Sequence, residues 1–442
     1  MPDSRPLAAA LFVFLIVSCG GNPQVLVPID TDVRSGFFEE ALEAINAERN
    51  RGRGGRRGIY RSPRNDILFY LDRGMVLHFA GMFEESIRDL HRAEQLIEEA
   101  FTISLTQEMG TFLLNDNVRD YSGEDYEDLY INVFNALNFF HLGDIEGALV
   151  EIRRLNLKLN FLADRHERVK RRVTDSNPMI DIRNIPMEAS RFSNSALARY
   201  LGVLFYRATG RHDSARVDFE ELHRAFELAP QVYNHPIPSS VADELFVPPG
   251  LGRLNVIAFT GLSPVKEREN LFLPLPFPPP HHFIRFEYPV MVSRPQTIFR
   301  VEAVLDNGKR FPLELLEDMG AVARETFKSR QGTIILKTVA RTIAKHTGTA
   351  VTAAAVTRNS GEGWGLLVSI LGRIATEITE QADLRLSRFF PSQALVGGIN
   401  LEPGKYFLTV NFYGSRGLVF SERREIIVNE RGLNLEQFVC LK

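Results

Sequence analysis

The chain has 442 residues, of which 52 are Lys or Arg and 55 are Asp or Glu, so its formal net charge is −3. At roughly 100–200 residues per domain, this length predicts two or three domains. Because the charges are nearly balanced, no overall field selects a polyanion, and we expect no nucleic-acid partner. Only two cysteines are present, which excludes a disulfide framework as the source of stability.

The N-terminal apolar stretch ends at a cysteine. Residues 7–17 are apolar and lead into Ile16-Val17-Ser18-Cys19-Gly20, which resembles the lipobox of bacterial lipoprotein signal peptides. The stretch is too short to span a membrane, which takes about 20 residues. The resemblance implies that residues 1–18 are a signal peptide and that Cys19 carries a diacylglyceryl group and palmitate. Arg5 is the single cation before the stretch, so an uncleaved apolar N-terminus is the alternative.

The residue after the cysteine indicates which membrane would hold the anchor. Gly20 stands where an Asp would direct a lipoprotein to the inner membrane, so the resemblance implies the periplasmic face of a Gram-negative outer membrane. The membrane is then a partner through the lipid on Cys19. Residues 19–34 contain Pro23 and Pro28 and show no periodicity, so we expect a tether.

An arginine-rich stretch follows at residues 49–64. Its composition of arginines and glycines offers little that could form a core, so we expect a loop. One interpretation is a solvated loop. The other is contact with anionic lipid headgroups or an envelope polymer, because a basic cluster near a lipid anchor adds about 1 kcal/mol of attraction per cation.

Residues 35–230 are predicted to form helical hairpins similar to tetratricopeptide (TPR) repeats. Apolar residues recur at helical spacing in three segments, namely residues 67–98, 128–159 and 195–230. Each segment has a glycine where its turn is expected, at Gly81, Gly143 and Gly210. In the first pair we expect the two helices to approach closely where Gly74 faces Ser86.

The turn glycines lie more than 60 residues apart, whereas a contiguous TPR array repeats at about 34 residues. Either degenerate repeats or loops must fill the gaps. We expect a helix at residues 101–114 and a loop at residues 164–187. A generic helical bundle is the alternative to a TPR-like array.

Residues 253–442 are predicted to form a β-rich domain after a proline-rich linker at residues 231–252, which makes the fold class α+β. Strand-like runs occur at residues 254–260, 282–288, 297–305, 405–412 and 419–428. A helical block at about 320–387 is inserted between them, and it packs on the sheet, on the membrane or on a partner. Cys440 lies in an apolar run and is expected in the core.

Several segments together resemble a poorly characterised family of bacterial TPR-containing outer-membrane lipoproteins. The matching pieces are spread over most of the chain: Tyr126-Glu127-Asp128-Leu129, residues 136–138, residues 143–156, Gly261-Leu262-Ser263-Pro264-Val265-Lys266-Glu267, Glu380-Gln381-Ala382-Asp383-Leu384-Arg385 and Leu401-Glu402-Pro403-Gly404-Lys405-Tyr406. Residues 386–391 depart from the family's pattern. The resemblance implies outer-membrane anchoring and a TPR-plus-β layout, and it supplies no catalytic residue.

No motif indicates a cofactor, a metal or a catalytic site. The glycines of residues 361–365 lack the spacing of a dinucleotide fingerprint, His281-His282 has no third ligand at a recognisable spacing, and there is no Gly-x-Ser-x-Gly elbow. The candidate partner-binding residues are charged: Glu151, Arg153 and Arg154 on a TPR-like helix, and Asp383 and Arg385 at the end of the helical block. For both groups the alternative is a structural ion pair or a solvated face.

The sequence favours a non-enzymatic, lipid-anchored periplasmic scaffold that binds a protein or peptide through TPR-like helices. It could serve an envelope assembly, secretion or motility machine. The alternative is an envelope enzyme or a carbohydrate-binding protein with a site in the C-terminal domain. The sequence identifies neither the partner nor the oligomeric state.

Overall fold

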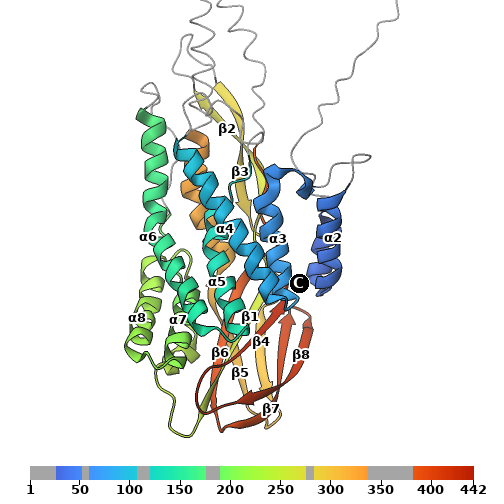
Figure 1. Cartoon of the computed structure of the whole chain (residues 1–442), viewed down its shortest axis with the longest axis vertical. Coiled ribbons are helices and arrows are strands. Elements are labelled where there is room, and N and C mark those ends of the chain that lie inside the picture. The colour runs from blue at the N-terminus through green and yellow to red at the C-terminus, as the bar shows by residue number, and fades with distance from the viewer. Residues whose placement is uncertain (1–25, 52–58, 107–119, 176–189, 275–282, 337–381) are drawn as a thin grey trace, which may run out of the picture.

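The computed structural model describes residues 26–51, 59–106, 120–175, 190–274, 283–336 and 382–442 (Figure 1). The predicted signal peptide and Cys19 lie outside these residues. So do residues 52–58 of the arginine-rich stretch and residues 337–381 of the predicted helical block. Among the described helices, none is both long enough and apolar enough to cross a membrane.

The chain is helical earlier than the sequence predicted. Helix α1 (Val27–Ser35) occupies part of the predicted tether, and α2 (Phe38–Asn50) follows. Pro28 lies in the first turn of α1, where a missing N–H costs nothing. Ile29 and Val33, four residues apart, are buried on one face. The prediction of a tether was therefore wrong for residues 27–34, because two apolar residues at helical spacing were overlooked.

Three helical hairpins follow, as predicted. They are formed by α3 (Asp66–Phe79) with α4 (Phe83–Thr106), α5 (Asp125–His141) with α6 (Ile145–Asp175), and α7 (Ala196–Ala208) with α8 (His212–Leu228). The turn glycines Gly81, Gly143 and Gly210 have φ of +75°, +80° and +72°, a conformation that glycine adopts without strain. The turns are therefore set by the glycines that marked them in the sequence.

The close approach predicted for the first hairpin is present. The Ser86 hydroxyl donates to the Gly74 carbonyl over 2.8 Å, and a Cβ on Gly74 would lie 2.8 Å from Cδ2 of Leu90. Only a residue without a side chain leaves room for α4 at this point, because interiors are close-packed.

Helices α4 and α6 are longer than expected. Helix α4 runs to Thr106, so the described part of the helix predicted at residues 101–114 continues α4. Helix α6 runs to Asp175, where a loop was predicted from residue 164. The segment contains neither Gly nor Pro before Pro178, and Arg168 pairs with Asp164 one turn earlier at 2.6 Å. Such pairs at i,i+4 favour a helix, which the loop prediction ignored.

Within the described ranges, the C-terminal half contains nine strands in two sheets. The five predicted strands are present as β1 (Gly252–Leu262), β3 (Phe283–Val292), β4 (Arg300–Leu305), β7 (Gly404–Gly414) and β8 (Gly417–Val428). Strand β5 (Arg310–Asp318) is the second of two strand-like runs on either side of the turn signal Asp306-Asn307-Gly308. Three others were not predicted: β2 (Val265–Pro274), β6 (Pro391–Leu401) and β9 (Asn434–Cys440). Strands β2 and β3 form a separate antiparallel pair.

The larger sheet has the order β8-β7-β4-β5-β6-β1-β9 and is antiparallel except between β1 and β9. It is curled and nearly closed. One face encloses a core of its own, which includes Val256, Val410, Phe412, Phe438 and Cys440. The prediction that Cys440 is a buried core residue is thus confirmed.

Strand β1 joins the two halves of the protein because both of its faces are buried. Val256 and Ala258 point into the core of the sheet, whereas Ile257 and Phe259 belong to the helical core. Phe134 of α5 contacts Phe259 with ring centroids 5.2 Å apart. The helices therefore cover the outer face of the sheet and share one continuous core with it (Figure 1).

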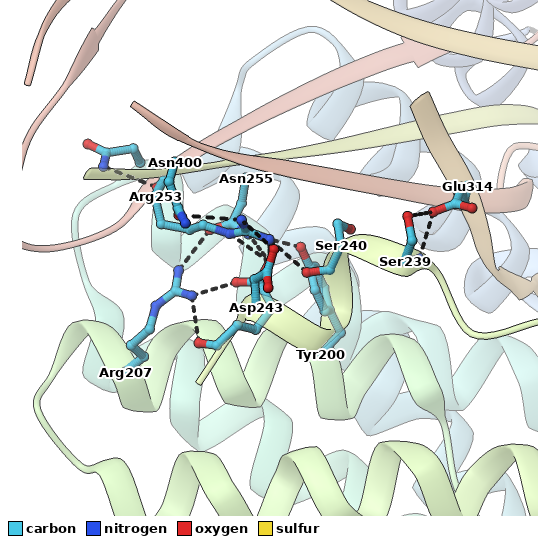
Figure 2. Close-up of polar contacts among 11 residues, drawn as sticks. Tyr200, Arg207, Ser239, Ser240, Asp243, Arg253, Asn255, Glu314 and Asn400 are labelled. Atoms are coloured by element: carbon cyan, nitrogen blue, oxygen red, sulfur yellow. Dashed lines mark hydrogen bonds and ion pairs between the residues drawn. The ribbon is translucent and has the colours of Figure 1, made fainter. Parts of the chain in front are cut away.

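The predicted linker at residues 231–252 is packed between the halves. Its Tyr233 and Val241 are buried, and a 3-10 turn spans Ser239–Asp243. Glu244, which follows this turn, has no exposed surface. Its carboxylate accepts hydrogen bonds from Arg207 of α7 at 2.5 Å and from two residues of β1, Arg253 at 2.9 Å and Asn255 at 2.7 Å. Figure 2 shows these β1 and α7 side chains converging beside the turn.

The predicted helical block is confirmed at its start and wrong at its end, and its residues 337–381 lie outside the described residues. Residues 319–336 are helical, whereas residues 382–390 have no regular secondary structure and lead directly into β6. Hydrogen bonds from the backbone of residues 387 and 388 to side chains of α3 and α5 replace helical hydrogen bonds there.

Replacing Glu244 with Ala tests whether this cluster holds the halves together. Arg253, whose side chain is 3 % exposed, would lose its partner, and such a loss destabilises a protein by about 3–5 kcal/mol. Denaturant-induced unfolding measures the change. Asp243→Ala is the matched control, because this neighbour is 64 % exposed and 3.6 Å from Arg253. The control should cost less than about 0.5 kcal/mol. Equal effects of the two substitutions would contradict the assignment.

Candidate functional site

A segment of the same chain packs against α3 and α5 of the first two hairpins. The side of the hairpins that faces this segment and the sheet is called the inner face. Residues 382–390, here called the inner segment, lie without regular secondary structure against α3 and α5. Its residues Phe389 and Phe390 are fully buried. The Phe390 ring lies 5.9 Å from the rings of both Tyr126 and Phe134. The hairpins therefore already contact a non-helical segment of chain on this side, and the chain itself supplies it.

Two buried carboxylates accept hydrogen bonds from the inner segment. The Ser387 N–H donates to Glu127 at 2.6 Å, and the Arg388 N–H donates to Asp72 at 2.9 Å. The Ser387 hydroxyl also donates to Asp72, at 2.7 Å. A buried backbone N–H group needs a hydrogen-bond acceptor. Among the described residues no strand lies beside the inner segment at this point, so the two carboxylates supply the acceptors for Ser387 and Arg388.

Each of the two carboxylates also accepts a hydrogen bond from one tyrosine. Tyr60 donates to Asp72 at 2.6 Å, and Tyr121 donates to Glu127 at 2.7 Å. Burial raises the pKa of Asp72 to about 6. Burial and the nearby Glu124 raise the pKa of Glu127 to about 7. Both carboxyls therefore hold protons more tightly in the folded protein than in the unfolded chain.

The N-terminus of α5 contributes the remaining charges. Glu124 is the N-cap of α5 and forms a capping box with Glu127, which satisfies N–H groups at the helix start. The Glu124 carboxylate pairs with Lys266 of β2 at 2.5 Å and with Arg330 of the helix at residues 319–336, at 3.0 Å. Lys266 also donates to the carbonyl of Arg385, over 3.0 Å. One helix end thus ties together β2, the helix at residues 319–336 and the inner segment.

The residues around these contacts come from three of the sequence segments that carried the family resemblance. Tyr126-Glu127 lies on α5, Gly261–Glu267 joins β1 to β2, and Asp383-Leu384-Arg385 opens the inner segment. They are more than 100 residues apart in the sequence and meet in one buried place. We call this place the motif junction.

Asp383 and Arg385, which were candidates for partner recognition, form an ion pair with each other at 2.7 Å. Arg385 also lies over the Tyr121 ring, 5.6 Å from its centroid, and donates to Asn65 at 3.2 Å. The pair itself lies in backbone without regular secondary structure, and the helix predicted to end just before it lies outside the described residues. Its contacts serve the attachment of the inner segment to the hairpins.

Glu151 and Arg154 belong to a second cluster between the first two hairpins. Glu151 is buried and accepts from Asn132 at 2.6 Å and from Arg154 at 2.9 Å. Arg154 also pairs with Glu94 of α4, at 2.5 Å. Arg153, the third predicted residue, is exposed. The structure therefore joins Glu151 and Arg154 in an inter-helix ion-pair network and leaves Arg153 available at the surface.

The motif junction is suited to holding a peptide backbone. Its carboxylates accept several hydrogen bonds each from tyrosine, serine and backbone donors. Within the described ranges, no group of three or more His, Cys, Asp or Glu side chains is arranged to hold a metal ion. Asp72 was missed in the sequence analysis, because its i, i+12 relation to Tyr60 could not have been read from spacing. Glu127 was part of a quoted motif, and its capping-box relation to Glu124 was the available signal.

Comparison with protein-family models, with curated proteins and with solved structures finds no match to this chain.

Replacing Glu127 with Gln tests the electrostatics of the motif junction. Because the folded pKa of Glu127 is about 7 against an ordinary value of 4.5, the folded protein binds more protons than the unfolded chain in this window. The free energy of unfolding should therefore fall as the pH rises from about 4.5 to about 7. Glu127→Gln should lose the part of this decline between pH 6 and 7, where the slope is at most about 1.4 kcal/mol per pH unit.

Denaturant unfolding curves between pH 4.5 and 8 measure the slope. Glu84→Gln, an exposed change on α4, is the matched control and should keep the wild-type profile. A Glu127→Gln profile identical to that of the wild type would show that this carboxyl does not titrate in the window.

Proposed function

We propose that this protein is a lipid-anchored adaptor of the bacterial outer membrane, attached through Cys19 and non-enzymatic. It binds a protein partner through the outer face of its helical hairpins, as an accessory part of an envelope machine. The lipobox and the resemblance to TPR-containing lipoproteins support the anchor. The contacts of the hairpins support the choice of face.

The inner face of the hairpins is not free for a partner. From Asp125 to Asn138 of α5, every residue except the half-buried Asp128 is buried, against the neighbouring helices, the inner segment and the sheet. Displacing the inner segment would expose Phe389 and Phe390 and leave the donors and acceptors of Ser387 unpaired. Each unpaired buried polar group costs about 1–3 kcal/mol. A partner that binds at low cost must use another surface.

The outer face of α6 offers such a surface, and this observation carries the proposal. Val150, Leu157 and Phe161 are 44 %, 57 % and 61 % exposed. At about 100° per residue, spacings of seven and four place all three side chains on one side of the helix. Exposed Arg153 lies on the same side. We call these four residues the α6 stripe.

The α6 stripe lies within the first 17 residues of α6, alongside α5, and the rest of α6 continues past the start of α5. Helix α6 comprises 31 residues, and α5 comprises 17 residues. At a rise of about 1.5 Å per residue, α6 is therefore about 46 Å long and α5 about 25 Å long. Figure 1 shows α6 rising past α7 and α8.

A partner helix with an apolar face can lie along α6 and cover the stripe. It would bury Leu157 and Phe161, which each contribute about 1.5–3 kcal/mol when fully buried. Arg153 would favour an acidic residue beside that face, because opposite charges at the rim of an interface steer the partner into register.

Replacing Cys19 with Ala tests the anchor. We expect the wild type to incorporate radioactive fatty acid and to fractionate with the outer membrane. Cys19→Ala has no thiol to acylate, so it should incorporate none and should remain uncleaved. Cys440→Ala, at the buried second cysteine, is the matched control and should label like the wild type. Labelling of Cys19→Ala would refute the anchor.

Replacing Leu157 and Phe161 with Glu tests the α6 stripe. A photocrosslinking residue placed at Asn160, exposed beside the stripe, should give one dominant crosslinked protein in intact cells. The double substitution should reduce this product at least tenfold, because two buried apolar contacts are lost. Its thermal midpoint should stay within a few degrees of the wild type, because both residues are exposed.

Val217→Glu, at an apolar residue of α8 that is 51 % exposed, is the control for a new surface charge. It should leave the crosslinked product unchanged. Loss of the product in both variants, or in neither, would argue against the α6 stripe as the partner site.

A further inference from the structure

Arg294, between β3 and β4, is a buried cation whose nitrogens lack hydrogen bonds. The residue is 8 % exposed, and none of its three side-chain nitrogens has a hydrogen-bond partner among the described residues. A buried guanidinium with unpaired N–H donors is costly and rare, because buried charges are normally paired. The arrangement therefore calls for an acceptor that the described part of the chain does not supply.

The carboxylate near Arg294 is already occupied. Asp30 of α1 lies 3.8 Å from Nη1 of Arg294, which is too long for a hydrogen bond. It instead pairs with Arg388, which donates through both Nε and Nη2. Arg34 adds a third guanidinium to the surroundings of Arg294. Two guanidinium groups thus flank Asp30, and the Asp72 carboxyl lies near Arg388. With Arg34, the three guanidinium groups outnumber the two carboxyls at this place.

A hydroxyl group lies beside the unpaired guanidinium. The β2–β3 pairing joins Val265 to Val292, and continuing it by two residues places Ser263 opposite Arg294. Ser263 is 1 % exposed, and its hydroxyl makes no well-formed hydrogen bond in the described structure. The Tyr126 hydroxyl lies close to both groups. The Tyr126 hydroxyl donates to the Ser387 carbonyl over 3.4 Å, so the guanidinium and the serine hydroxyl are the donors left for an oxyanion.

We propose that Arg294, Arg388 and Ser263 form a binding site for a phosphate-type oxyanion. A doubly charged anion would offset the excess positive charge, and the planar fork of Arg294 suits two oxygens of one anion. Arg294 lies just below the surface, because Ser293 and Pro295 on either side of it are exposed. The anion comes either from free phosphate or from the headgroup of a lipid. The site joins α1, β3 and the inner segment, so binding stabilises the attachment of α1.

Thermal unfolding of the full chain in detergent tests this site. Inorganic phosphate is titrated at constant ionic strength, with chloride as the replaced anion. The wild-type midpoint should rise and saturate, because a ligand that binds only the folded state stabilises it. Arg294→Met should show no rise, and without phosphate it should melt at or above the wild type, since its buried charge is gone. Arg216→Met, at an exposed arginine of α8, is the charge-matched control and should keep the rise.

A second variant covers the case in which Arg294→Met fails to fold. Arg294→Lys keeps the charge but loses the two-pronged donor, and it should need about tenfold more phosphate for half of the rise. Glycerol 3-phosphate acting at lower concentration than phosphate would identify a lipid headgroup as the source, and the reverse order would identify free phosphate. A wild-type midpoint that ignores phosphate, an equal rise in Arg294→Met, or an equal rise with acetate would overturn the proposal.

Discussion

The structure depends on two buried carboxylates, Asp72 and Glu127, that accept hydrogen bonds from the backbone of the inner segment. A buried segment without regular secondary structure has no strand beside it to satisfy its N–H groups, and each unpaired group would cost about 1–3 kcal/mol. Asp72 on α3 and Glu127 on α5 accept hydrogen bonds from these N–H groups and so remove this cost. Their own burial is offset by tyrosine donors, Tyr60 and Tyr121. The same contacts that satisfy the segment also fix the sheet to the helices, because β6 begins immediately after it.

This attachment explains why the helical half and the β-rich half share one core. The helical hairpins alone would expose the faces of α3 and α5 that contact the inner segment and the sheet, and a curled sheet alone would expose its outer face. Here each covers the other. Strand β1 is buried on both faces as a result, and the polar cluster around Glu244 holds the connection between α8 and β1 in place. Separating the halves would expose both apolar faces and several buried charges together, so we expect the protein to unfold as one unit.

The sequence predicted those features that depend on local contacts. The hairpins followed from helical periodicity and from Gly81, Gly143 and Gly210, because these residues act within one turn. Strand β6 was missed because Gly397 and Gly398 weaken its strand pattern, although β1 and β5 flank it in the sheet. The predicted helical block included residues 382–387 because their side chains favour a helix. In the structure these residues are not helical, since the segment they open is bound to α3 and α5. Strand β6 and residues 382–387 are decided by partners distant in the sequence, whereas α1 and the end of α6 carried local signals that were overlooked.

The distribution of polar and apolar groups over the hairpins separates structure from recognition. On the inner face, the carboxylates, tyrosines and arginines of the motif junction are paired within the chain, whereas Arg294 and Ser263 lie together without such hydrogen bonds. On the outer face of α6, three large apolar side chains have no cover in the part of the chain that the structure describes. A buried and satisfied polar network resists exchange, because any competitor must replace each hydrogen bond before it gains anything. An exposed apolar stripe has the opposite property, since every contact with it removes apolar surface from water. The partner that we propose would therefore bind on the outside of the hairpins, while the inside serves the fold.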